Sequence, residues 1–412
     1  MSISQNFPEE GPTLNLNFAG SKTLDPRITF SRTTTGTYMD DSGLIKVAPA
    51  DAPRFDHRYV NGEIESLGLL VEEERSNLFT RSEEITTAYF GGGGTIGTDT
   101  ILNPYGISSS VSYVTTSERV RLFNADGYST LAFSFFSKKR FGGLERDYAY
   151  IEIFQVAVGG GSLQAYYFNY DGNNSDGTYV KDVKTEQYPN GWYRFSCRLV
   201  ARSDYNGGTF STTSRVDIEG GYSDNYVWGI QVEAASFATS YMPTSGSTAT
   251  RNPDNVSMTG DNFSDWYNQS EGSILWRGTI DSLPISGSRI FEVYNSSTDT
   301  ERMAISVEND GTMYMRVRKT NDTATQTYGL GTVSYGSEYK ISLGVDGSSL
   351  CLAVNDEIKT TISDSFILSS SDTLIFTDLR DLGGSRKFTT RHTGLSYYPT
   401  RLTNAQLQTL TK

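Results

Sequence analysis

Cysteine and histidine are both rare in this sequence, each occurring only twice in 412 residues. Cys197 and Cys351 lie far apart and match no metal-binding or redox spacing, so we expect each thiol to be a small, buried apolar side chain. His57 and His392 form no H-x-x-x-H pair and stand beside no pair of cysteines, which argues against a zinc site. For both histidines we predict a structural hydrogen bond and no catalytic role.

Positive charge and long apolar runs are also scarce. The chain has 35 Lys and Arg against 48 Asp and Glu, for a formal net charge of −13. We therefore expect no nucleic-acid partner, because a phosphate backbone is bound by clustered cations. No stretch approaches the roughly 18 consecutive apolar residues of a membrane span, so no membrane insertion is expected. The opening MSISQNFPEEGP resembles no export signal, since it lacks both a basic and an apolar region.

Glycine and aromatic residues are abundant. Forty glycines, 26 tyrosines and 21 phenylalanines favour short strands joined by tight turns, and helical periodicity is scarce. In YAYIEIFQV (148–156) both alternating sets of residues are largely apolar, which is typical of a strand buried between two layers. Similar strands repeat along the chain at the spacing of a jelly roll. The sequence therefore predicts an all-β fold with two jelly-roll sandwiches.

Turn-rich segments divide the chain into three predicted parts. Residues 1–78 are expected to form an extended arm and a β-rich docking module, in which LNLNFA (14–19) alternates as a half-buried strand would. Residues 79–250 would form the first sandwich and residues 251–412 the second. Hairpin turns are predicted at Asn309-Asp310-Gly311 and Asp346-Gly347. A short helix is predicted near the C-terminus.

That helix is predicted from TNAQLQTLTK. Thr403 or Asn404 would cap its N-terminus, and Leu407 and Leu410, three residues apart, would pack on the sandwich edge.

Three stretches carry a resemblance to known proteins. The first runs from Leu24 to Phe79, with LDPRITFSRTTTGTYMDDSGLIKVAPADAPRFDH followed by SLGLLVEEERSNLF. The second is YVWGIQVEAASFATSYMPTSGSTATRNPD at Tyr226–Asp254, which is similar to the closing strands of a family-4/9-type carbohydrate-binding jelly roll. The third is FSDWYNQSEGSIL at Phe263–Leu275, with the terminal YYPTRLTNAQLQTLT, which is similar to a concanavalin A or laminin-G-like sandwich.

Together these stretches resemble a family of bacteriophage virion proteins described as tail-fibre, head-fibre or structural proteins. The resemblance implies a component of the virion, on the tail or head surface, with other virion proteins and host surface polysaccharide as its partners. It also implies a homo-oligomer, and a trimer is our expectation by analogy with the family. Sandwiches host many unrelated functions, so sugar binding has to be argued from a site.

Sugar binding needs flat aromatic rings beside polar groups in a preformed hollow. The predicted carbohydrate-binding residues of the first sandwich are Tyr166, Tyr167, Tyr170, Asp171, Asn173, Asn174, Trp192 and Tyr193. The alternative is that such strand tyrosines fill the core or form cross-strand pairs. Trp192 and Trp228 are the strongest candidates for core positions.

The loop DGNNSDGTYVKD (171–182) is rich in oxygen ligands. Asp171, Asn173, Ser175 and Asp176 are candidates for a structural calcium site. The loop departs from the EF-hand pattern, because Asp176 stands where glycine is required and Asp182 replaces the bidentate glutamate. An ordinary turn rich in Asp and Asn is the favoured interpretation, and no other cofactor is predicted.

Catalysis is not predicted. No G-x-S-x-G elbow or phosphate-binding glycine loop occurs in a suitable context. Glycoside hydrolysis would need two carboxylates about 5–10 Å apart, for which Glu63 with Glu65 and the run Glu72–Glu74 are candidates. Arg75 follows that run and favours a solvated or ion-paired face.

Three functions therefore stand as hypotheses. The first is a non-catalytic adhesin that binds host glycans, the second a purely architectural virion subunit (a tail collar or adaptor, or a capsid decoration), and the third a polysaccharide depolymerase.

Overall fold

The computed structural model describes residues 7–412 apart from 86–95, 115–116, 121–126, 143–145, 155–163, 204–205, 211–214, 220–223, 283–286, 299–300, 320–321, 323, 365, 367, 369 and 377–387. Within the described ranges, 29 strands, three short α-helices and one 3-10 turn (Asn206–Gly208) form the chain. The prediction of an all-β fold with two jelly-roll sandwiches is confirmed. No helix in these ranges combines the length and the apolar character needed to cross a membrane.

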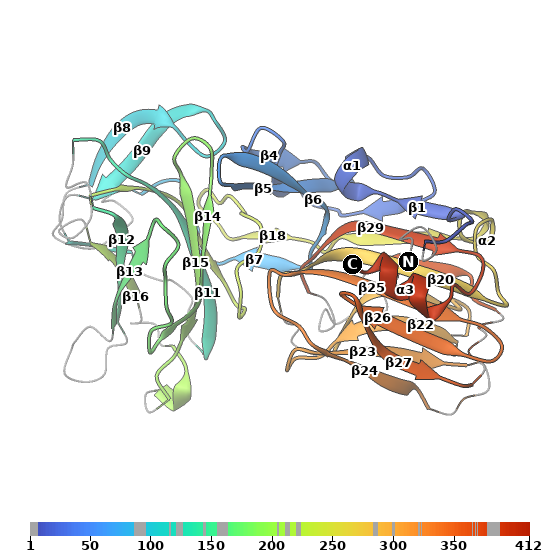
Figure 1. Cartoon of the computed structure of the whole chain (residues 1–412). Coiled ribbons are helices and arrows are strands. Elements are labelled where there is room, and N and C mark those ends of the chain that lie inside the picture. Colours follow the sequence, from blue (N-terminus) through green and yellow to red (C-terminus); the bar gives the residue numbers. More distant parts are fainter. Residues whose placement is uncertain are drawn as a thin grey trace.

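One antiparallel sheet of 14 strands runs through the whole molecule (Figure 1). Its order is β27 (Glu357–Ile362), β26 (Leu350–Val354), β25 (Glu338–Val345), β20 (Gly272–Ile280), β29 (Thr390–Tyr398), β6 (Glu63–Val71), β5 (Arg54–Val60), β14 (Val180–Gln187), β15 (Tyr193–Val200), β11 (Thr130–Lys138), β17 (Tyr226–Glu233), β9 (Ser108–Val114) and β8 (Ile96–Leu102), with β1 (Leu14–Leu16) pairing with β29. The sheet therefore contributes one layer to each sandwich.

A second sheet completes the C-terminal sandwich. Its order is β2 (Thr29–Ser31), β19 (Asn255–Thr259), β28 (Thr373–Phe376), β21 (Ser288–Tyr294), β22 (Arg302–Val307), β23 (Thr312–Arg318) and β24 (Gln326–Thr332). Trp276 and Leu395 from the large sheet share one buried core with Phe291, Ile305 and Phe376 from this sheet. Burial of alternate apolar residues from both layers holds the two sheets together.

A four-stranded sheet completes the other sandwich. Its order is β10 (Ser117–Val120), β16 (Arg215–Glu219), β12 (Tyr148–Phe154) and β13 (Gln164–Asn169). Phe168 of β13 meets Phe135 of β11 and Phe195 of β15, with ring centroids 5.4 Å from each. Cys197 lies in the same core, and Cys351 is also buried, so the prediction for the two thiols is confirmed. Residues 155 and 156 of the predicted strand YAYIEIFQV lie outside the described residues.

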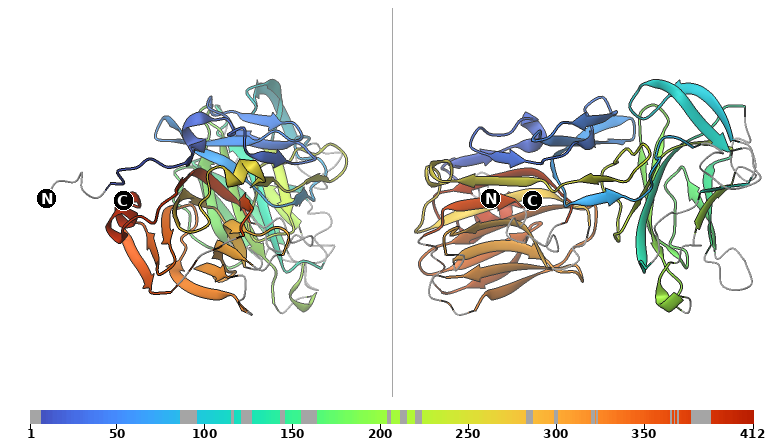
Figure 2. Two further views of the ribbon diagram at one scale, coloured as in Figure 1. Left: turned by 90° about the vertical axis from the view of Figure 1, so that its right-hand side faces the viewer. Right: turned by 180° about the vertical axis from the view of Figure 1, so that it is seen from behind.

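The first 78 residues contribute strands to the rest of the fold. β1 and β6 both pair with β29, and β2 pairs with β19. Figure 2 shows these strands, drawn in blue, lying along the C-terminal sandwich. β7 (Arg75–Asn77) pairs with β18 (Ala249–Arg251) and forms a ribbon between the two bodies. The remaining hairpin joins β3 (Gly36–Met39) to β4 (Ile45–Ala48).

The predicted strand LNLNFA is only partly formed. β1 ends at Leu16, because the side chain of Asn17 accepts a hydrogen bond from the backbone N–H of Gly20 and caps α1 (Phe18–Ser21). Phe18 was expected on a strand, but it lies in this helical turn, and its side chain is buried.

The turns and the terminal helix follow the prediction. Gly311 adopts a φ of 84° between β22 and β23, and the backbone N–H of Asp346 bonds to Ser349 between β25 and β26. α3 (Asn404–Leu410) begins at Thr403, whose side chain forms a capping box with Gln406. α2 (Asp261–Ser264) precedes Trp266, which is buried.

Candidate functional site

The structure divides the predicted sugar-binding tyrosines between two faces of β13. The ring of Tyr166 is buried against Phe168, and its hydroxyl donates to the carbonyl of Ser175 at 2.6 Å. Tyr167, the next residue, is 43% exposed and contacts the rings of Tyr148 and Tyr150 on the outer face. Successive residues of a strand point to opposite faces, so these two rings cannot contact one ligand together.

The other predicted rings belong mainly to the interior. Tyr170 is buried and bonds through its hydroxyl to Ser137 Oγ at 2.8 Å. Half-buried Tyr193 packs edge-on against Tyr170, with ring centroids 4.9 Å apart. Trp192 is fully buried and donates from Nε1 to the carbonyl of Leu102 at 2.9 Å. Trp192 therefore fills the core position that the alternative interpretation assigned to it, as does Trp228, which is 2% exposed.

The loop at residues 171–176 is held by its own hydrogen bonds. Asp171 Oδ1 accepts from the N–H of Asn173, and Asp176 Oδ1 accepts from the N–H of Asp182. The side-chain oxygen of Asn174 accepts from the N–H of Asn169. These contacts are those of a turn rich in Asp and Asn. In the described part of the chain, no three His, Cys, Asp or Glu side chains are grouped as metal ligands would be.

The candidate carboxylates for glycoside hydrolysis do not face one another across a hollow. Glu63 and Glu65 are exposed, and Glu65 pairs with Arg58 at 2.7 Å. Glu72 is buried, and its Oε2 lies 2.6 Å from Arg54 and 3.1 Å from Arg251. Burial would raise the pKa of Glu72, but Arg251 and Arg54 together lower it far below its usual value.

Arg54, in β5, also links the end of β6 to the segment that precedes β19. Its second nitrogen lies 2.5 Å from Asp254, which pairs in turn with Arg32 at 2.8 Å. All these side chains are buried, so removing Asp254, for example, would leave the charge of Arg32 without its carboxylate partner. The predicted ion-paired arrangement of the Glu72–Glu74 run therefore holds for Glu72 and for Glu73, which pairs with Arg75, although both lie in the interior and not on a solvated face.

A cleft of about 520 Å³ opens beside this ion-pair network. It lies at the joint of the large sheet, where β5 and β14 share a single residue pair, Tyr59 with Gln187, and then separate. β5 and β14 line it, together with residues 237–241, Asp281, Tyr335 and Arg391. A volume of this size falls within the range of about 300–1,000 Å³ that ligand sites occupy.

Arg391 is held between two carboxylates in this cleft. Its Nε donates to Asp56 Oδ2 at 2.8 Å, and its Nη1 lies 2.6 Å from Asp281 Oδ2. Burial alone would lower the pKa of Arg391, but Asp281 and Asp56 raise it. Burial raises the pKa of Asp281, and Arg391 acts against that shift. The three groups form a fixed, charge-assisted network that joins β5 to the start of β29.

Asp56 and His57 both bind the backbone of Met39. Asp56 Oδ1 accepts from the N–H of Met39 at 2.8 Å, and His57 Nδ1 lies 3.1 Å from its carbonyl oxygen. A bulge in the pairing of β5 with β6 falls between these two residues. The predicted structural hydrogen bond of His57 is confirmed. The same prediction holds for buried His392, whose Nδ1 accepts from Trp276 Nε1 at 2.9 Å.

Aromatic rings complete the wall of the cleft. They belong to Tyr38, Tyr59, Tyr188, Phe237, Tyr241 and Tyr335. Tyr335, in the loop between β24 and β25, is 45% exposed and is the most accessible of them. The cleft therefore combines exposed ring surface with a rigid set of polar groups.

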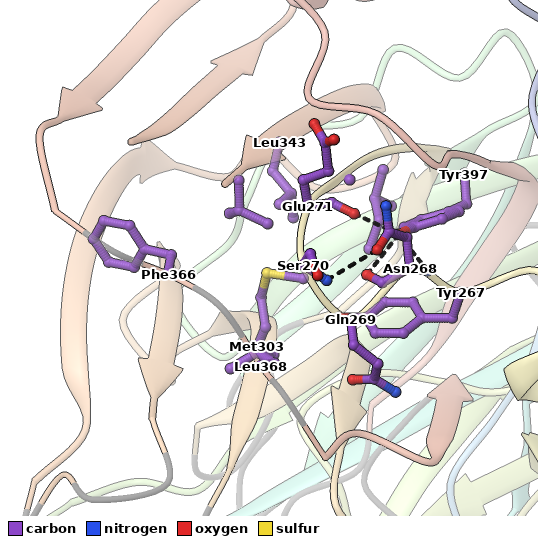
Figure 3. A pocket seen from close by; sticks show the side chains of 13 residues that line it. Tyr267, Asn268, Gln269, Ser270, Glu271, Met303, Leu343, Phe366, Leu368 and Tyr397 are labelled. Atoms are coloured by element: carbon purple, nitrogen blue, oxygen red, sulfur yellow. Dashed lines mark hydrogen bonds between the residues drawn. The ribbon is translucent and has the colours of Figure 1, made fainter. Parts of the chain in front are cut away.

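A second hollow lies in the C-terminal sandwich beneath Tyr397 (Figure 3). Its volume is about 10 Å³, and the hydroxyl of Tyr397 donates to the carbonyl of Glu271 at 3.0 Å at its wall. Such a space holds at most about one water molecule, so it is no ligand site.

Sequence reasoning missed the cleft. Its residues come from positions 37 to 391, and only long-range strand pairing brings them together. The segment Arg54–His57 lies in a stretch that carries the resemblance, and only His57 in it is singled out by residue type. Its cluster of ionisable residues is the one local signal for the cleft.

No family model and no curated protein matches this chain. Among solved structures, the CBM40 of the Ruminococcus gnavus IT-sialidase bound to α2,6-sialyllactose is 16% identical, with a TM-score of 0.31, over 35% of this chain and 85% of that one. A SAP-like pentraxin from Limulus polyphemus is 15% identical, with a TM-score of 0.29, over 34% and 70% of the two chains.

A Trypanosoma rangeli sialidase in complex with a difluorinated keto-deoxy-nononic acid is 12% identical, with a TM-score of 0.32. That match covers 38% of this chain and 25% of the sialidase. At this level the three likenesses extend no further than the β-sandwich itself and say nothing of what this chain binds.

Proposed function

We propose that this protein is a non-catalytic attachment subunit of a bacteriophage particle, in a tail fibre, spike or head fibre, and that it binds host-cell surface glycans in the cleft between its two sandwiches. The cleft carries the proposal. It offers exposed aromatic surface at Tyr335 beside the fixed polar groups of Asp56, Asp281 and Arg391. Saccharides present apolar C–H faces and hydroxyl groups, which these two kinds of surface complement.

The virion context of the proposal comes from the sequence. The stretches Leu24–Phe79, Tyr226–Asp254 and Phe263–Leu275 resemble phage structural proteins. An assembly of several copies, with a trimer as the expected form, would turn weak binding in each cleft into strong attachment through avidity.

The test is binding of the full-length protein to polysaccharide purified from host cells, measured by calorimetry. We expect Tyr335→Ala to weaken binding by about tenfold or more, as loss of an aromatic anchor does. Tyr167→Ala is the matched control, because this exposed tyrosine lies on a different sheet, away from the cleft lining, and its loss should leave affinity unchanged.

Two outcomes would count against the proposal. Failure to bind any host polysaccharide would contradict the attachment role. New reducing ends, released when the protein meets its polysaccharide, would show a depolymerase instead.

A second candidate, an architectural virion subunit, is favoured by exposed apolar side chains. Phe141 is 97% exposed, and Ile107 and Leu102, at the turn between β8 and β9, are 61% and 52% exposed. Leu102 and Ile107 flank one turn, and apolar side chains gathered on a surface are typical of protein contacts. A density map of the particle with the β8–β9 turn against another virion protein, and the cleft closed off, would favour this role.

A further inference from the structure

We infer that the cleft selects a neutral, hydroxyl-rich saccharide and discriminates against glycans that carry carboxylate, sulfate or phosphate groups. This inference rests on the proposed function, because it names the class of glycan that the same cleft would bind.

The charged residues that line the cleft are balanced. The cations are Arg58, Lys184, Arg194 and Arg391, and the acids are Asp56, Glu72, Glu186 and Asp281. An anionic ligand would therefore meet as many carboxylates as cations at close range. The attraction by the cations and the repulsion by the carboxylates oppose each other, so a negative charge on the sugar adds little to the binding free energy.

Arg391, a largely buried cation of the cleft wall, is already engaged by two acids. Asp56 Oδ2 accepts a hydrogen bond from Nε of Arg391 at 2.8 Å, and Asp281 Oδ2 lies 2.6 Å from its Nη1. A ligand carboxylate that took either position would displace one of these groups and leave a largely buried carboxylate without that partner. The cost of an unpaired buried charge exceeds the gain from a new ion pair of the same kind.

The other three cations are engaged as well. Arg194 donates to the carbonyl of Thr239 at 2.6 Å and lies 3.7 Å from Glu186, and Lys184 Nζ donates to the carbonyl of Asp281 at 3.0 Å. Arg58 pairs with Glu65 outside the cleft wall. Among the described residues, the cleft therefore presents no cation that lacks a polar partner.

Three buried atoms of cleft-lining residues have neither a hydrogen-bond nor an ion-pair partner among the described residues: His57 Nε2, Thr389 Oγ1 and Arg194 Nε. Arg194 Nε donates and the Thr389 hydroxyl can donate or accept, so a sugar hydroxyl, which does both, suits each of them. His57 Nδ1 faces the carbonyl of Met39, which can only accept, so in a ring with a single N–H that proton is on Nδ1. Nε2 is then an acceptor. A sugar hydroxyl can donate to it, whereas a carboxylate or sulfate has no proton to give.

The experiment compares matched pairs of oligosaccharides on the full-length protein: lactose with 3′-sialyllactose, and N-acetyllactosamine with its 6-sulfated form, together with neutral and acidic polysaccharides from host cells. We expect the neutral member to bind about tenfold or more tightly in at least one pair. Raising NaCl from about 50 to about 500 mM should leave that affinity unchanged, because no ligand charge is screened.

A charge variant provides the complementary test. Asp281→Asn removes one of the two acids on Arg391 and should raise affinity for the acidic member of the pair several-fold. Asp41→Asn makes the same change in charge at an exposed position outside the cleft. It should raise the affinity for neither the acidic nor the neutral member of the pair. If Asp281→Asn does not fold, the salt series on the unaltered protein decides the question.

The outcomes separate the two proposals. Binding of acidic glycans as tightly as their neutral counterparts, or more tightly, with affinity that falls as salt rises, would overturn the inference and leave the attachment role standing. Binding of neither class would overturn both.

Discussion

Arg391 Nε donates to Asp56 Oδ2 at 2.8 Å and so joins two residues that lie 335 positions apart in the chain. Asp281, which directly follows β20, contacts Nη1 of the same guanidinium. We expect Arg391→Gln to reduce the free energy of unfolding by about 3–5 kcal/mol, because two largely buried carboxylates would lose their shared partner. Urea unfolding followed by tryptophan fluorescence measures the change.

The control for this variant is Lys22→Gln. Lys22 pairs with Asp41 at 3.0 Å, but both side chains are exposed, so the loss should stay below about 1 kcal/mol. Equal small losses in the two variants would show that the Arg391 network contributes little to stability.

Trp266 gives a second prediction of stability. Its ring is 3% exposed and meets Phe263 and Tyr397, with centroids 4.9 and 5.0 Å away, and its Nε1 donates to the carbonyl of Asn262. Trp266→Ala should cost about 3–5 kcal/mol through lost burial. Phe141→Ala, at a side chain that is 97% exposed, should change stability by about 0.5 kcal/mol or less. A Trp266 variant as stable as the Phe141 variant would refute the assignment of this ring to the core.

His392 predicts how stability depends on pH. Burial lowers its pKa to about 3 in the folded protein, from a usual value of 6.5. Between these two values the unfolded chain binds a proton that the folded chain does not. The contribution of His392 to the free energy of unfolding is therefore fully present above pH 6.5. It is lost as the pH falls toward 3, by up to about 1.4 kcal/mol per pH unit.

The comparison of His392→Gln with the unaltered protein isolates that contribution. We expect the difference in free energy of unfolding between the two proteins to shrink as the pH is lowered from 7 to 5, since glutamine does not titrate. A constant difference over this range would show that His392 is protonated equally in both states.

The thiols provide a chemical test of burial. Burial raises the pKa of the Cys197 thiol well above its usual value, and Cys351 is fully buried beside α3. A thiolate is the reactive form, so neither residue should react with a disulfide reagent in the native protein. Unfolding in urea should release two thiols per chain. Rapid reaction of either one without denaturant would contradict the buried placement.

Local features of the fold could be predicted because their causes are local. Thr403 caps α3 with its own side chain, and the turn at Gly311 needs a positive φ that glycine allows. The end of β1 was predicted less well, since Asn17 competes for the backbone and starts a helical turn after only three strand residues.

The candidate site required information that no local pattern holds. Tyr166 and Tyr167 are neighbours in a tyrosine-rich strand, yet one ring lies in the core and the other on an outer surface, away from the cleft. Asp56, Asp281 and Arg391 are ordinary charged residues in the sequence. Only the pairing of β29 with β6 and with β20 brings the three together.

The pairing of β1 with β29 has a consequence for synthesis. Leu14 aligns with Tyr397, so the C-terminal sandwich cannot close until nearly the whole chain has left the ribosome. The strands between 96 and 233 need no later sequence for their mutual pairings and can fold first. Until then, the N-terminal strands that pair with the C-terminal sandwich keep unpaired edges. Closure of that sandwich is therefore slow, and the nascent chain is exposed to aggregation.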